Sequence, residues 1–246
     1  MSPLSKPNIP SDVAQLLLRV KNTNISPLYE LSPSAARKEF ERRSAILEID
    51  AEEVKKTKDI FVDAEDRKLR MRLYWGQECT TDSMLLFVHG GGWVLGSIEG
   101  YDKLCRRLAN RIRLPIASVD YRCAPESPFP AGLKDVSFAI ESMRELTVDY
   151  NIKNSNWAIM GDSAGGNLAA AAISYQPKNA ITASHQFLIY PVIDLSTERQ
   201  SRSTYGEGFL LDSQLMKWFG KHYVGKNDFS NRFNWRLSKR WKNGLS

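Results

Sequence analysis

The stretch Gly161-Asp162-Ser163-Ala164-Gly165-Gly166 decides the fold of this chain. It directly follows the apolar run 157–160, which predicts a strand, and it opens the small-residue run 164–175, which predicts a helix. A strand-to-helix turn of this kind has no room for side chains at its first two glycines. It would therefore hold Ser163 in a strained backbone, with its hydroxyl exposed above a sheet. Taken alone, the motif also fits a Gly-rich turn that binds phosphate or only packs tightly.

The segments around this motif alternate between predicted strands and predicted helices. The wholly apolar run Met84–Val88 predicts a strand that is buried on both faces of a parallel sheet. Further strands are expected at 59–62, 69–74, 115–119 and 185–190, and further helices at 101–113 and 131–146. This alternation is typical of an α/β fold, with a mostly parallel sheet and helices on both of its faces.

The segments outside this alternation predict additional helices. Residues 11–22 place their apolar side chains on one face, and a second helix is expected over 33–47, with Pro33 at its first position. The expected organisation is N-terminal cap helices over 1–50, an α/β core over 51–225 with a cap insertion at about 195–225, and a basic, atypical tail over 226–246.

Charge is concentrated at one end of the chain. The net charge is +6, and residues 226–246 supply +5 of it, with six basic side chains and one acid. The remaining residues are almost neutral, so the basic balance predicts no nucleic-acid partner. Trp235 and Trp241 lie between those basic residues, and a nucleic-acid or membrane surface is the alternative interpretation of this segment.

Composition narrows the class of protein further. No apolar run is long enough to predict stable membrane insertion, and the first residues do not read as a signal peptide, so we expect a cytoplasmic protein. Cys79, Cys105 and Cys123 are odd in number and lack metal-site spacing, so reduced thiols and no metal are expected.

A second motif, His89-Gly90-Gly91-Gly92-Trp93, follows the strand predicted at Met84–Val88. Three consecutive glycines lose much conformational entropy on folding, so a loop that contains them is expected to bring its backbone close to another group. In acyl transfer that group is the oxyanion of the tetrahedral intermediate, which needs N–H donors already in position. The backbone N–H groups of Gly90, Gly91 and Ala164 can provide them. The alternative, a nucleotide-binding loop, requires G-x-G-x-x-G, and this loop lacks that spacing.

Together these motifs resemble the hormone-sensitive-lipase-like branch of the α/β hydrolases, a family with many bacterial short-chain carboxylesterases. The resemblance covers about residues 55 to 225. It includes the two glycine motifs, and it extends to Asp120-Tyr-Arg-Cys-Ala-Pro-Glu126, Phe129-Pro-Ala131 and Tyr190-Pro191.

The resemblance implies an α/β-hydrolase fold with a helical cap and an esterase mechanism. Ser163 would attack the ester carbonyl, with Gly90, Gly91 and Ala164 holding the oxyanion, while His89 and Gly92 support the loop. The implied partner is a small-molecule ester with a short or medium acyl chain. No cofactor is implied.

The acid and the base that such a serine needs are not identified. In this fold both follow the serine along the chain. His89 precedes it, His185 opens a predicted strand, and His222 lies in a helix predicted over 214–223. Asp162 adjoins the serine, but its side chain should point away from the Ser163 hydroxyl. Asp194 and Asp212 match no acid position of the family. We therefore assign neither group.

These gaps lead us to expect a chain that lacks the last strands of the sheet. The ending is read either as a frame shift near residue 231 or as a family segment, 237–245, that is cut shortly afterwards. An exposed sheet edge and poor solubility are expected in both cases.

Two other functions remain open: a non-catalytic small-molecule receptor on the same fold, and an inactive remnant. The sequence does not set the acyl-chain preference or the oligomeric state.

Overall fold

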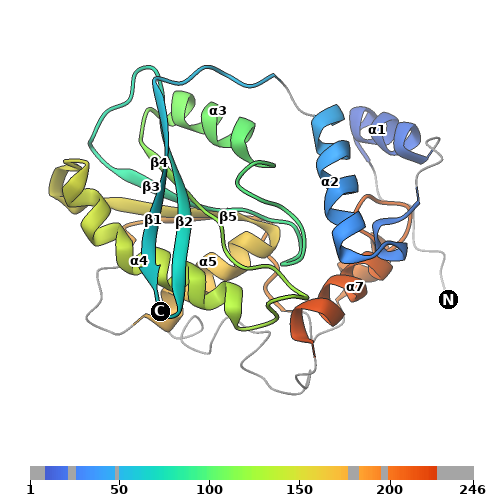
Figure 1. The fold of residues 1–246 in the computed structure, drawn as a ribbon. Helices are drawn as coiled ribbons and strands as arrows, with labels where there is room; N and C mark the ends of the chain where they lie inside the picture. The colour runs from blue at the N-terminus through green and yellow to red at the C-terminus, as the bar shows by residue number, and fades with distance from the viewer. Residues whose placement is uncertain (1–8, 22–25, 48–49, 177–182, 195–198, 226–246) are drawn as a thin grey trace.

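The strand β3 (Met84–Val88) lies in the middle of a six-stranded sheet, as its wholly apolar sequence predicts. The computed structural model describes residues 9–21, 26–47, 50–176, 183–194 and 199–225. The strand order is β1-β2-β4-β3-β5-β6 (Figure 1). The other strands are β1 (Lys56–Ala64), β2 (Arg67–Trp75), β4 (Ile116–Val119), β5 (Trp157–Asp162) and β6 (Gln186–Ile189).

The helices fall close to the segments expected from the sequence. They are α1 (Ser11–Lys21), α2 (Pro33–Leu47), α3 (Asp102–Ile112), α4 (Ala131–Asp149), α5 (Ser163–Tyr175), α6 (Gln200–Thr204) and α7 (Ser213–Val224), with short 3-10 turns η1 (Leu28–Glu30) and η2 (Lys153–Ser155). Local signals set several starts: Pro33 opens α2, and the Asp212 side chain accepts a hydrogen bond from the Leu215 N–H at the start of α7.

The central strands run parallel, and their register aligns the two glycine motifs. β3 pairs with β5 so that Val88 lies opposite Gly161. Because the carboxyl ends of neighbouring parallel strands meet at one edge of a sheet, the loop after β3 and the turn after β5 lie side by side. Among the described strands only β2 runs in the opposite direction, and it pairs antiparallel with β1 and with β4.

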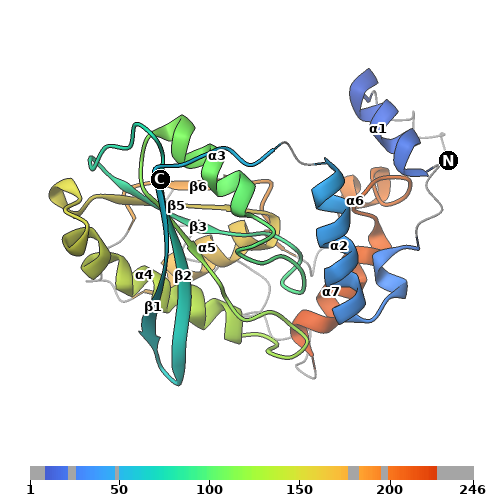
Figure 2. The same cartoon turned by 45° about the horizontal axis from the view of Figure 1, so that its top comes forward.

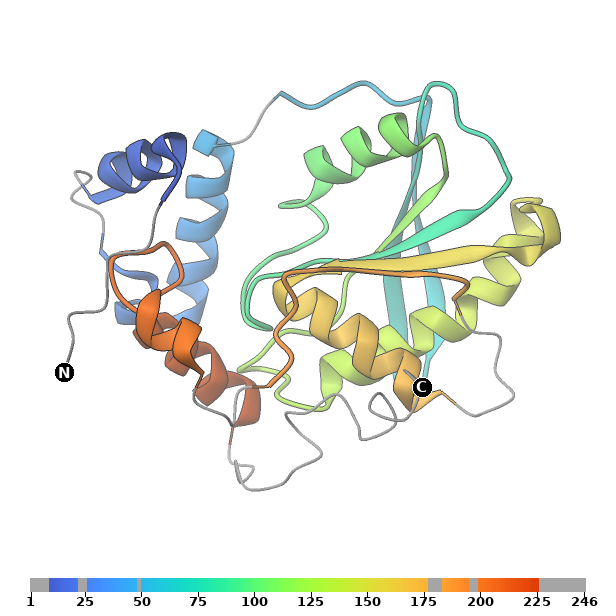
Figure 3. The ribbon, with the colours of Figure 1, turned by 180° about the vertical axis from the view of Figure 1, so that it is seen from behind.

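Helices cover both faces of the sheet, as predicted. Figures 1 and 3 show α3 on one side, and α4 and α5 on the other. The alternation along β3 matches this arrangement: Leu86 belongs to the large core cluster under α4 and α5, whereas Phe87 belongs to a smaller cluster under α3. The mostly parallel α/β fold class is therefore confirmed.

The cap elements gather at the carboxyl edge of the sheet. Figure 2 shows α1 and α2 beside α6 and α7, although the two pairs are far apart in sequence. Arg37 of α2 ties this group to the core, because its guanidinium donates hydrogen bonds to the carbonyl oxygens of Val94 and Ala124, each at 2.8 Å. Residues 195–198 of the expected insertion and the 226–246 tail lie outside the described residues.

β6 is an edge strand in the part of the chain that the structure describes. It pairs with β5 alone, and Phe187 and Ile189 are 47% and 38% exposed. No helix within the described ranges has the length and apolar character needed to cross a bilayer.

Candidate active site

Ser163 occupies the junction between β5 and α5. Its φ is 52°, a left-handed conformation that is unfavourable for a residue with a side chain. A Cβ on Gly165 would press against the carbonyl oxygens of Val88 and His89, and one on Gly161 would lie 2.6 Å from the Gly165 carbonyl. The glycines are therefore needed for the sharp strand-to-helix turn that the sequence predicts.

The start of α5 supplies unpaired backbone donors beside this serine. Ser163 and Ala164 are the first two residues of the helix, so their N–H groups have no acceptor within it. The loop after β6 closes against the same turn, since the Val192 N–H donates to the Ser163 carbonyl at 3.2 Å. The hydroxyl thus lies at the positive end of a helix, where developing negative charge is stabilised.

The glycine loop after β3 is also wound into left-handed conformations. Gly91 has a φ of 113° and Gly92 a φ of 60°. The Gly91 carbonyl accepts hydrogen bonds from the N–H groups of Val94 and Leu95, at 3.2 and 2.8 Å. Gly92 packs against the ring of Phe219 in α7, where a Cβ would collide with that ring. The loop is therefore held from the core side and from the cap side.

His89 is buried beneath this loop. Its Nδ1 lies 2.8 Å from the Gly90 carbonyl, and a carbonyl can only accept, so Nδ1 carries the proton. The ring stacks on Tyr121 with 4.3 Å between centroids, and the Tyr121 hydroxyl donates to the His89 carbonyl at 2.8 Å. Burial lowers the pKa of His89, which favours the neutral ring. This geometry is that of a support beneath the loop.

Gly90 requires a correction to the expected set of oxyanion donors. Its N–H donates to Asp162 Oδ1 at 2.9 Å, so it is not free for an oxyanion. The Asp162 carboxylate, which belongs to the other glycine motif, accepts from the N–H group of Gly90 that was expected to bind the oxyanion. No hydrogen bond to another described residue uses the Gly91 N–H. The geometry leaves Gly91 and Ala164 as available donors.

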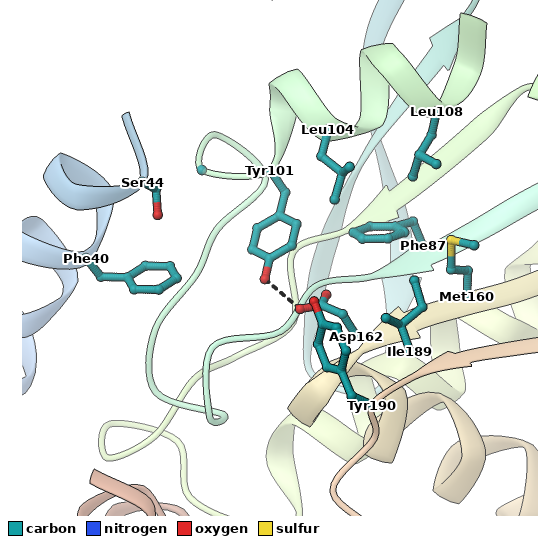
Figure 4. A pocket seen from close by; sticks show the side chains of 11 residues that line it. Phe40, Ser44, Phe87, Tyr101, Leu104, Leu108, Met160, Asp162, Ile189 and Tyr190 are labelled. Atoms are coloured by element: carbon teal, nitrogen blue, oxygen red, sulfur yellow. Dashed lines mark hydrogen bonds between the residues drawn. The ribbon is translucent and has the colours of Figure 1, made fainter. Parts of the chain in front are cut away.

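Asp162 points away from the serine, as expected. Its second oxygen, Oδ2, accepts a hydrogen bond of 2.9 Å from the Tyr101 hydroxyl (Figure 4). Burial raises the pKa of Asp162, and the hydrogen bonds from Tyr101 and Gly90 act in the opposite direction. Sequence reasoning missed Tyr101, because no local motif marks it.

Two cavities flank the turn. The first, of about 340 Å³, lies on the α3 side, and Asp162, Tyr101 and Tyr190 line it together with apolar side chains (Figure 4). The second, of about 830 Å³, lies between Tyr190 and the cap elements α6 and α7. Ser163 is half-buried and lines neither cavity, but its neighbour Asp162 lines the first one. Tyr190, which lines both, lies two residues before Val192, whose N–H donates to the Ser163 carbonyl.

The described histidines provide no base for Ser163. His185 lies at the opposite end of the sheet, because its carbonyl accepts from Ile159 near the start of β5. His222 packs edge-on against Trp218 in α7, with 4.5 Å between ring centroids. Burial and the nearby Lys221 lower its pKa. Neither imidazole makes a hydrogen bond to Ser163.

The remaining acidic candidates also have other contacts. The Asp212 carboxylate caps α7, and Arg202 donates a hydrogen bond of 2.7 Å to the backbone carbonyl of Asp194. Across the described ranges, no group of His, Cys, Asp or Glu is placed to hold a metal ion.

Comparison with known proteins matches this chain to α/β hydrolases and to named ester hydrolases. A family described as "alpha/beta hydrolase fold" matches residues 85–243, which includes most of the basic segment 226–246. Ethyl acetate hydrolase of Pseudomonas putida is 34% identical over 206 residues, covering 81% of this chain and 65% of that protein. Arylesterase of Saccharolobus solfataricus is 35% identical over 172 residues, covering 70% of this chain and 56% of that protein.

Solved structures show the same fold. An ester hydrolase from the metagenome of Lake Arreo superposes with a TM-score of 0.85 at 30% identity, covering 94% of this chain and 76% of that one. A hyperthermophilic esterase from the archaeon Pyrobaculum calidifontis gives a TM-score of 0.82 at 32% identity, covering 89% and 71%. The chain therefore spans less than two thirds of the two curated relatives, and it belongs to the alpha/beta hydrolase fold family, in the hormone-sensitive-lipase-like branch that its motifs predicted.

Proposed function

We propose that this chain carries the nucleophile and the oxyanion site of a carboxylic ester hydrolase. The observation that supports this most is the position of Ser163, with φ 52° at the first residue of α5 and beside the glycine loop. Ser163 Oγ attacks the ester carbonyl, the alcohol leaves, and an acyl-enzyme remains for hydrolysis by water.

The N–H groups of Gly91 and Ala164 stabilise the oxyanion in this proposal. Gly90 holds the loop to Asp162, while His89 and Gly92 keep it in shape from below and from the cap side. Removing one such donor lowers the rate by about 10² to 10³ in comparable enzymes.

The proton of the Ser163 hydroxyl needs an acceptor, and the described residues hold no imidazole at hydrogen-bond distance. We therefore expect slow acylation by the chain as given, with solvent taking the proton.

The substrate class follows from the relatives and the cavities. The curated relatives are named for small esters, ethyl acetate and aryl esters. A cavity of about 830 Å³ beside Tyr190 is large enough for a short or medium acyl ester. A cytoplasmic location remains a prediction from the sequence.

A fluorophosphonate probe tests the nucleophile. We expect one adduct on Ser163, located by peptide mass spectrometry, and no adduct in Ser163→Ala. Labelling of another serine with Ser163 unmodified would contradict the assignment. Ser142, a half-buried serine in α4, serves as the unreactive internal control.

A non-catalytic receptor is the second candidate, favoured by the lack of an imidazole beside Ser163 among the described residues. It predicts saturable binding of a small ester, measured by calorimetry, without turnover and without probe labelling. An adduct on Ser163, formed even slowly, would exclude it.

A further inference from the structure

The carboxylate of Asp162 joins three segments that are distant in sequence. Oδ1 accepts from the Gly90 N–H of the glycine loop, and Oδ2 accepts from the Tyr101 hydroxyl at the start of α3, both at 2.9 Å. Asp162 itself is the last residue of β5, directly before Ser163. One side chain thus bonds the loop that offers oxyanion donors to the strand that carries the nucleophile.

Gly90 lies so close to the Asp162 carboxylate that there is no space for a side chain at position 90. A Cβ on Gly90 would press on Oδ2 and would lie 2.9 Å from the carboxyl carbon. Only glycine lets the loop approach this carboxylate, so the first glycine of the loop is explained by Asp162. The second and third glycines are explained by their left-handed conformations.

Tyr101 is itself held by contacts of its ring with two other aromatic side chains. Its ring lies 5.8 Å from that of Phe87 in β3 and 5.5 Å from that of His89, measured between centroids. The hydroxyl is therefore aimed at Asp162 (Figure 4). With both oxygens occupied and turned away from the serine, Asp162 is not placed to take the Ser163 proton.

We propose that Asp162 is a positioning residue that sets the distance between Ser163 and the Gly91 N–H, and that Tyr101 orients it. The inference rests on the proposed function, because the distance matters only if the Gly91 N–H receives an oxyanion. Gly91 directly follows the residue that Asp162 holds, so loss of the bond lets the donor move. The cavity of about 830 Å³, which Asp162 does not line, keeps its shape.

The kinetic test uses diethyl p-nitrophenyl phosphate. A bond forms from Ser163 Oγ to phosphorus, the phosphorus–oxygen bond breaks, p-nitrophenolate leaves, and the hydroxyl proton passes to solvent. In Asp162→Ala we expect the limiting rate constant of phosphorylation to fall about tenfold, comparable to losing one buried hydrogen bond, with the half-saturating concentration unchanged.

Conservative variants separate positioning from folding. Asp162→Asn keeps one acceptor for Gly90 and offers its amide to the Tyr101 oxygen, so it should retain most of the wild-type rate. Tyr101→Phe keeps the ring contacts and loses only the hydroxyl, so its rate should lie between those of wild type and Asp162→Ala. Met160→Leu, in the same cavity wall, is the control and should change nothing. Equal rates in wild type and Tyr101→Phe, together with a low rate in Asp162→Asn, would overturn the proposal.

Amide hydrogen exchange at Gly90, followed by NMR on the 15N-labelled chain, does not depend on activity. We expect protection in wild type and in Asp162→Asn, and faster exchange in Asp162→Ala. Identical exchange in all of them would overturn the positioning role even if Ser163 reacts. Exchange that depends on Asp162 without any adduct on Ser163 would instead refute the proposed function and leave the bond between loop and elbow intact. If Asp162→Ala does not fold, Tyr101→Phe and Asp162→Asn still give the decisive comparison.

Discussion

The two faces of the sheet differ in how completely the described residues cover them. Under α4 and α5, Leu86 and Ile159 are fully buried in a continuous core. On the α3 side, Leu104 and Ile189 remain 40% and 38% exposed around the cavity of Figure 4. The difference arises because α3 packs mainly against β2 and β4, and the β5–β6 half of this face is less covered by described residues.

The candidate site lies on the boundary between these regions. Ser163 starts α5 on the well-covered side, while Asp162, one residue earlier, faces the cavity beside α3. The nucleophile turn is therefore built on the well-covered face, and the carboxylate that holds the glycine loop to it lies on the less covered one. Each prediction below tests that contrast, beginning with the largest effect.

Leu86→Ala should give the largest loss of stability. The side chain is fully buried in β3, and its removal leaves a cavity that the packed helices cannot close. We expect the free energy of unfolding in urea to fall by about 2–5 kcal/mol. A loss no greater than that of a surface leucine would mean that the α4/α5 face is not the stable one.

Gly165→Ala should give the second-largest loss of stability, because Gly165 lies where the nucleophile turn contacts the backbone at Val88 and His89. The new Cβ would press on the Val88 and His89 carbonyl oxygens, which belong to the backbone and cannot rotate away. Overpacking of this kind costs about 1–3 kcal/mol. Fluorophosphonate labelling of Ser163 should slow as well. Gly100→Ala is the matched control, since its Cβ would meet nothing closer than 3.4 Å.

Asp162→Asn should show a smaller effect that depends on pH. Burial raises the pKa of Asp162 above 3.8, so the folded chain binds this proton more tightly than the unfolded chain. The stability linked to that proton is complete below pH 3.8 and is lost as the pH rises through the folded-state pKa. The amide of the Asp162→Asn variant does not titrate. The free energy of unfolding of the variant minus that of wild type should therefore increase as the pH rises through that window, and then stay constant. Urea unfolding at a series of pH values measures this, and a constant difference would contradict it.

Leu104→Ala should have the smallest effect, because the side chain is already 40% exposed in α3. We expect a change below about 1 kcal/mol in the free energy of unfolding. A loss as large as that of Leu86→Ala would remove the contrast between the two faces.

The sequence by itself determined the elements around the two motifs and the conformation at the nucleophile turn. Met84–Val88 and Pro33–Leu47 form the elements predicted over those residues, because apolar runs and a first-position proline act locally. The glycines flanking Ser163 likewise encode its turn, since the steric limits on φ are a property of neighbouring residues.

Only the tertiary structure decided which groups face one another across the site. Asp162 bonds Gly90, 72 positions away, and Tyr101, 61 positions away. Those pairings depend on the register of β3 against β5 and on where α3 begins, and neither motif contains that information. For the same reason, the Gly90 N–H was expected to serve an oxyanion, although it is taken by a carboxylate that long-range packing brings beside it.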